Sequence, residues 1–132
     1  MAMIIADTDV LIDFLFNKEP AASRNSSELD KGDLRTTVIT RFELLSSLGS
    51  DKQKAGARHL LETLETLPLD VPASDRAAEV RNELEKQGLG IGMGDSLIAG
   101  IVLQNKGTLL TRNQKHFSRV RGLRLGHLNS HA

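Results

Sequence analysis

Short apolar runs alternate along this chain with segments of helical periodicity, and this alternation limits the folds open to it. Strands are expected at residues 3–6, 34–39 and 108–111, with weaker candidates at 67–71, which contains Pro68, and at 123–125. Helices are expected at residues 10–16, 21–29, 41–48, 51–66, 75–87 and 95–103. Such an order predicts an α/β fold, a three-layer α/β/α sandwich around a mostly parallel sheet of four to five strands.

The length of 132 residues predicts one domain, spanning residues 1–132, with a single core. The chain has no Cys, so any metal must be held by oxygen or imidazole ligands. No apolar run approaches the roughly 20 residues of a membrane-spanning helix, and the N-terminus lacks the layout of a signal peptide. We therefore expect a soluble cytoplasmic protein.

Four polar side chains are expected to meet at one edge of the sheet. Asp7 and Asn113 follow strands, while Asp95 opens a helix and Glu43 forms a capping box with Thr40 at the start of another. Carboxyl ends of parallel strands and amino ends of the following helices share an edge, so residues far apart in sequence converge there. A simpler reading of the first group is that Thr8 or Asp9 caps the first helix.

Three carboxylates on one edge raise each other's pKa because their charges repel. A hard divalent cation, Mg²⁺ or Mn²⁺, removes this conflict, and it binds carboxylate and water oxygens. With a phosphodiester bound, such a cation polarises the phosphoryl group and activates water. The pattern thus predicts metal-assisted hydrolysis of a phosphate ester.

Charge is distributed unevenly along the chain. From Ser96 onward there are six Lys and Arg residues and no Asp or Glu, whereas the preceding part has 11 Lys and Arg against 17 acids. Part of the molecule is therefore suited to face a polyanion, although scattered solvated cations explain the composition equally well. A base-stacking platform is not expected, because the chain has no Trp or Tyr and its four Phe residues are predicted to lie in the core.

Four segments, at residues 4–13, 40–45, 94–99 and 110–117, resemble the motifs of PIN-domain ribonucleases of the VapC-like toxin branch, and they occur in that family's order. The resemblance implies that Asp7, Glu43 and Asp95 form the acidic metal site. The family often has a further Asp near residues 111–117, where this chain has Asn113 or His116.

The resemblance further implies an endoribonuclease that uses Mg²⁺ or Mn²⁺ and cuts RNA by in-line attack of a metal-activated water. Such proteins are typically toxins that a cognate antitoxin holds inactive, and they usually form homodimers. Asp7 and Asp95 would be metal ligands, and Glu43 a ligand or an orienter of the attacking water. Supporting roles fall to Asp9, which stands where the family commonly has Asn or Ser, and to Thr111 and Asn113.

Two basic residues beside the last motif, Arg112 and Lys115, are candidates for holding phosphates of the cut strand. Their charge alone suggests this role, and the alternative is that both are solvated surface cations.

Other readings remain open. A haloacid-dehalogenase-like phosphatase would use Asp7 as its nucleophile, but Ala99 stands where that fold expects an acid. A receiver domain would need a phosphoacceptor Asp and a Lys at the ends of strands, and Asp70 and Lys106 are poorly placed for these roles. An inactive PIN-like module that only binds a partner is the third alternative.

Overall fold

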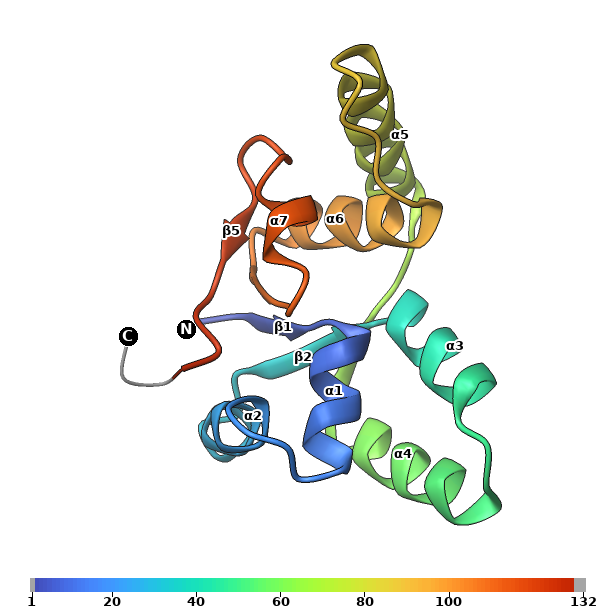
Figure 1. Cartoon of the computed structure of the whole chain (residues 1–132), viewed down its shortest axis with the longest axis vertical. Helices are drawn as coiled ribbons and strands as arrows, with labels where there is room; N and C mark the ends of the chain where they lie inside the picture. The colour runs from blue at the N-terminus through green and yellow to red at the C-terminus, as the bar shows by residue number, and fades with distance from the viewer. Residues whose placement is uncertain (1, 130–132) are drawn as a thin grey trace.

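The computed structural model describes residues 2–129. Its centre is a sheet of five strands in the order β3-β2-β1-β4-β5, and every neighbouring pair is parallel (Figure 1). The strands are β1 (Ile4–Ala6), β2 (Leu34–Thr37), β3 (Glu65–Leu67), β4 (Thr108–Leu110) and β5 (Arg124–Leu125). The predicted α/β/α fold with a mostly parallel sheet is therefore confirmed.

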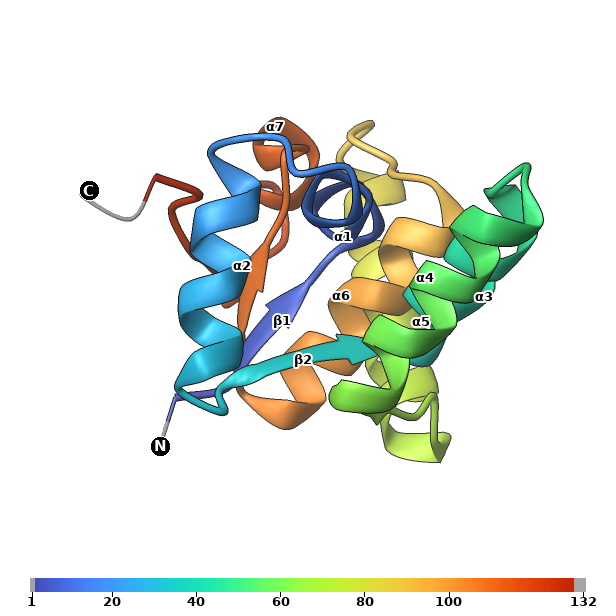
Figure 2. The ribbon, with the colours of Figure 1, turned by 90° about the horizontal axis from the view of Figure 1, so that it is seen from below.

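Helices cover both faces of the sheet. They are α1 (Thr8–Leu15), α2 (Ala21–Asp30), α3 (Val38–Ser47), α4 (Asp51–Thr63), α5 (Val71–Lys86), α6 (Met93–Asn105) and α7 (Gln114–Phe117). In Figure 1, α5, α6 and α7 lie on one side of β1 and β2, and α1, α2 and α4 lie on the other. In Figure 2, strand β1 leads directly into helix α1. Within residues 2–129, no helix is both long enough and apolar enough to cross a membrane.

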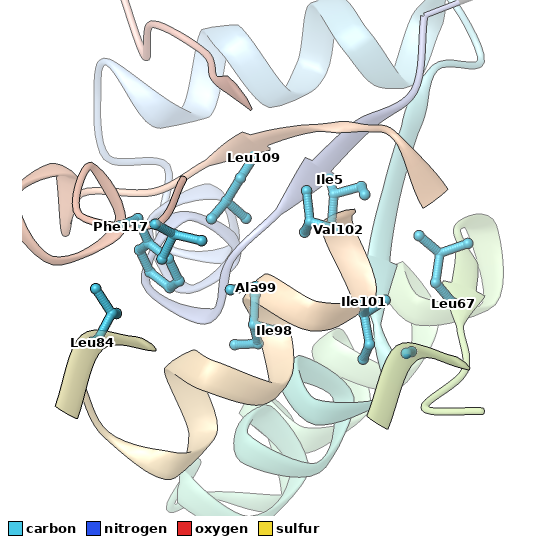
Figure 3. Close-up of a cluster of buried hydrophobic side chains, with 11 residues drawn as sticks. Ile5, Leu67, Leu84, Ile98, Ala99, Ile101, Val102, Leu109 and Phe117 are labelled. Carbon is cyan, nitrogen blue, oxygen red and sulfur yellow. The ribbon is translucent and has the colours of Figure 1, made fainter. Parts of the chain in front are cut away.

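The core consists of two clusters, one on each face of the sheet. Side chains alternate along a strand, so Ile5 and Leu109 pack with α5 and α6, whereas Ile4 and Leu110 pack with α1 to α4. Figure 3 shows the first cluster, in which Phe117 lies near Leu84 and Leu109. The sheet is therefore buried on both faces, as an all-parallel sheet requires.

Helices α5 and α6 cross closely at Gly100. A Cβ atom at this position would lie only 2.6 Å from the carbonyl oxygen of Ala73 and from both the nitrogen and the Cβ of Ala77. Only glycine allows the two backbones to approach this closely. The crossing holds α6, and with it Asp95, at a fixed position against α5.

The boundary between β2 and α3 differs from its prediction. Val38 and Ile39 were expected to extend the strand, but they form the first turn of the helix. Thr37 caps this helix, because its hydroxyl accepts a hydrogen bond from the backbone N–H of Thr40 at 3.1 Å. The predicted capping box of Thr40 and Glu43 is therefore wrong, and Glu43 lies in the second turn.

Three further expectations are corrected. Strand β3 begins at Glu65, two residues earlier than predicted, and ends before Pro68. Helix α5 begins at Val71, four residues before the expected start at residue 75, and its cap is Asp70, whose carboxylate accepts from the N–H of Ala73. Among the Phe residues, Phe117 is buried, but Phe16 is 42% exposed and Phe42 is 70% exposed, so these two do not belong to the core.

Candidate active site

Asp7 follows β1 directly and has only 5% of its surface exposed. It is itself the N-cap of α1, so the expected cap at Thr8 or Asp9 is not found. One carboxylate oxygen accepts from the N–H of Thr8 at 2.7 Å, and the other accepts from the hydroxyl of Thr111 at 2.7 Å. Thr111 follows β4, the neighbour of β1, and these contacts fix the carboxylate between two strand ends.

Glu43 reaches the same edge of the sheet from α3. Its Oε1 accepts a hydrogen bond of 2.6 Å from the hydroxyl of Thr8, the residue next to Asp7. The start of α6 approaches from the other side, since a Cβ atom on Gly94 would lie 3.3 Å from Oε2 of Glu43. The sequence offered no signal for the role of Thr8 beyond its place between two acids.

Asp95 lies in the first turn of α6, where the helix dipole favours a carboxylate. Its Oδ2 lies 3.4 Å from Nδ2 of Asn113 and 3.9 Å from Nδ1 of His116. The Asn113 amide lies 2.9 Å from the same imidazole nitrogen. Both residues that take the place of the family's further acid therefore lie beside Asp95.

The electrostatics couple the three acids. Burial raises the pKa of Asp7 to about 7, and the nearby charges of Asp9 and Asp95 add to this rise, against the opposing hydrogen bonds from Thr111 and Thr8. Burial also raises the pKa of Asp95, to which the charge of Glu43 contributes, while His116 and Asn113 oppose it. Ionising Asp7 and Asp95 together is therefore costly in the absence of a cation.

The donors fit a hard divalent cation in their chemistry, because they are carboxylate oxygens that repel one another. Within residues 2–129, no three His, Cys, Asp or Glu side chains lie close enough together to hold a metal ion, so the protein alone forms no cage of three such ligands. Mg²⁺ usually needs no such cage, since it retains several waters and binds through one or two carboxylates. Asp7 and Asp95 therefore fit an open, largely hydrated site.

Arg112 is held by two acids of α1. Its Nε lies 3.1 Å from Oδ2 of Asp13 and 3.9 Å from Oδ2 of Asp9, and its backbone N–H lies 3.2 and 3.4 Å from the two oxygens of Asp9. Asp13 is 8% exposed and was not among the predicted site residues, although it stands one turn after Asp9. A phosphate contact by Arg112 would have to compete with these bonds, whereas Lys115 is exposed.

Comparisons with known proteins agree on one family. The model of the PIN domain family matches residues 4–123. The chain is 29% identical over 130 residues to the tRNA(fMet)-specific endonuclease VapC of Shigella flexneri, covering 94% of this chain and 96% of that protein. It is 30% identical over 123 residues to Ribonuclease VapC2 of Rickettsia felis, covering 89% of this chain and 91% of that protein.

The fold also has close relatives among solved structures. The crystal structure of DNA-bound VapBC from Salmonella typhimurium superimposes with a TM-score of 0.85 at 26% identity, covering 97% of this chain and 99% of that chain.

Proposed function

The chain belongs to the PIN domain family, and on this premise we propose that it is an endoribonuclease that depends on Mg²⁺ or Mn²⁺ and hydrolyses RNA phosphodiester bonds. The observation that carries the proposal is the group of Asp7, Glu43 and Asp95 at one edge of the sheet. The pKa of Asp7 and that of Asp95 are raised by burial and by neighbouring carboxylates. Relatives named as an endonuclease and a ribonuclease support it.

In this proposal Asp7 and Asp95 hold the cation. When bound, Mg²⁺ or Mn²⁺ supplies Lewis acidity that polarises the phosphoryl group and makes water nucleophilic at neutral pH. Thr111 keeps one oxygen of Asp7 in place, and Thr8 fixes Glu43 through a bond of 2.6 Å. Glu43 is thereby positioned to take part in ligation or to orient the attacking water.

Asn113 and His116 complete the site beside Asp95. The Asn113 amide lies near both the carboxylate and the imidazole, and its own backbone N–H donates to the hydroxyl of Thr111 at 3.0 Å. Because Thr111 in turn donates to Asp7, a chain of hydrogen bonds connects the two proposed metal ligands. Asn113 therefore orients Asp95, and we assign it a supporting catalytic role.

The test is cleavage of total RNA by the purified protein with Mg²⁺ or Mn²⁺ and with a chelator. Asp95→Asn should abolish the cuts without unfolding the protein, because it removes the ligand charge but keeps a side chain of the same shape at this half-buried position. The matched control is Asp75→Asn, which removes an exposed carboxylate from α5 and should cut as well as the parent. Discrete cuts by Asp95→Asn, or cuts in chelator, would refute the proposed site.

Two alternatives are decided by the same preparation. An inactive PIN-like module would cut no RNA under any metal, although folded. A haloacid-dehalogenase-like phosphatase would release phosphate from a small phosphomonoester and trap an aspartyl-phosphate at Asp7. The match of the PIN family model across residues 4–123 supports the nuclease over the phosphatase.

We also propose that the protein is the toxin of a toxin–antitoxin pair, acts in the cytoplasm and consists of one domain over residues 1–132. A VapBC complex is among its structural relatives.

A hollow of about 460 Å³ lies between the end of α1 and the start of α4, and Leu15, Phe16 and Leu48 line it. We propose that it offers the cognate antitoxin an apolar docking surface. Phe16→Ser should then reduce co-purification of the antitoxin, and unchanged recovery would place the antitoxin elsewhere.

A further inference from the structure

The acid-free C-terminal part of the chain forms one wall of a cleft of about 450 Å³. The segment at residues 119–121 lies on one side of this cleft and α5 on the other, with Leu103 of α6 between them. Charged side chains line both walls: Arg119 and Arg121 belong to the first, and Arg76, Glu79 and Glu83 belong to the second.

The two walls differ in how their charges are satisfied. On α5, Arg76 pairs with Glu79 at 3.9 Å, and Glu83 accepts a hydrogen bond of 2.8 Å from Gln87. The side chains of Arg119 and Arg121, in contrast, have no ion pair or hydrogen bond with any residue in the range 2–129. Arg119 is also half-buried, so its side chain is partly held in the wall of the cleft while its charge has no partner among residues 2–129.

The wall that carries these two arginines is anchored in the core and is continuous in sequence with the candidate active site. Phe117 and Val120, on either side of Arg119, are buried in the core cluster of Figure 3 together with Leu84. One residue before Phe117, His116 lies 3.9 Å from Asp95. An RNA strand bound at the carboxylates of the proposed site can therefore continue along α7 and into the cleft.

We propose that this cleft binds the phosphate backbone of the RNA substrate beside the cut, with Arg119 and Arg121 each contacting a phosphate. The inference rests on the proposed nuclease function and adds a substrate-binding surface to it. A guanidinium presents a planar fork of donors that matches a phosphate. Of the side chains at residues 2–129, no aromatic one lines the cleft, so the contact is with the RNA backbone and not by stacking on bases.

The test measures binding of a fluorescein-labelled single-stranded RNA of mixed sequence in chelator, where metal-dependent cleavage is absent. For a single strand, the slope of log K against log salt changes by about 0.7 for each phosphate neutralised. Arg119→Gln with Arg121→Gln should therefore reduce the slope by about 1.4 between about 50 and 200 mM salt. Arg121→Gln alone, at an exposed position, should reduce it by about 0.7.

The matched control is Lys52→Gln with Arg58→Gln, two exposed cations on α4, which lies across the sheet from α5 and α7 (Figure 1). This variant has the same net charge as the double arginine variant and should keep the wild-type slope. An unchanged slope in the arginine variants, or an equal loss in the control, would overturn the inference. If the slope falls as expected but the wild-type protein cuts no RNA with metal, the nuclease proposal fails and the RNA-binding cleft stands.

Discussion

Asp7 performs two tasks whose electrostatic demands conflict. As the cap of α1 and the acceptor from Thr111 it is stabilised when ionised, since both bonds are stronger to a carboxylate. Burial and the charges of Asp9 and Asp95 oppose ionisation, and they prevail, because its pKa rises from 3.8 to about 7. The residue is therefore half protonated near neutral pH until a cation binds.

This conflict predicts how stability depends on pH in chelator. The pKa is higher in the folded than in the unfolded protein, so the stabilisation is complete below about pH 4 and is lost as pH rises through 7. The shift corresponds to a loss on the order of 4 kcal/mol, and Asp7→Asn should remove it. Urea denaturation of the two proteins between pH 4 and 8 measures the difference. Parallel pH profiles would contradict the prediction, and Asp75→Asn serves as the control.

Arg112 is predicted to hold the acids of α1 in place instead of binding phosphate. Arg112→Gln leaves the buried carboxylate of Asp13 without its cation, and a loss of about 1–2 kcal/mol is expected, between the values for exposed and buried pairs. Asp13→Asn in the same background should recover much of it. Chemical denaturation gives these values, with Arg81→Gln as the control because its partner Glu85 is exposed. A fall of about 0.7 in the salt slope of RNA binding would instead identify Arg112 as a phosphate ligand.

At this scale the sequence predicted which acids would meet but not how each is held. Asp7 and Asp95 were expected at a strand end and a helix start, and the structure places them there because topology alone determines it. The contacts of Thr8 with Glu43 and of Arg112 with Asp13 depend on the relative placement of separate elements. No local pattern encodes such placement.

Among the elements, the crossing of α5 and α6 gives a direct test of close packing. Alanine is favoured over glycine inside a helix by about 1 kcal/mol, but at Gly100 its Cβ would meet backbone atoms of α5 at 2.6 Å. Gly100→Ala should therefore destabilise the protein by about 1–3 kcal/mol. Gly56→Ala in α4, where a Cβ meets nothing within 4 Å, should stabilise it by up to about 1 kcal/mol. Thermal unfolding of both variants checks the pair, and equal effects would refute the close crossing.

Element boundaries were harder to predict than the elements themselves. The run at residues 34–39 is rich in β-branched residues and resembles one long strand, but the bond between Thr37 and Thr40 begins the helix inside it. β3 and the start of α5 were misplaced for a similar reason, because Pro68 ends a strand that had been expected to contain it. In each case a single helix cap or a proline outweighed the strand propensity of the neighbouring residues.

At the scale of the whole molecule, the exposed apolar side chains are not evenly spread. Phe42, on α3, is 70% exposed and Met93, on α6, is 66% exposed. The two helices lie close together, because a Cβ atom on Gly94 of α6 would lie 3.3 Å from Oε2 of Glu43 on α3. We propose this surface as the contact of the expected homodimer. Phe42→Ser should shift the protein from dimer to monomer in light scattering. A parent protein that is monomeric at all concentrations would refute the contact, and Val71→Ser, an exposed change on α5, is the control.

The hydrogen bond between Thr111 and Asp7 joins positions 104 residues apart, and β1 lies between β2 and the late strand β4. During translation, β1 can pair with β2 early, but its other edge stays open until β4 leaves the ribosome. Asp95, Thr111 and Asn113 leave the ribosome well after Asp7 and Glu43. A chain translated only as far as residue 90 therefore lacks half of the proposed site and cannot yet carry the proposed activity.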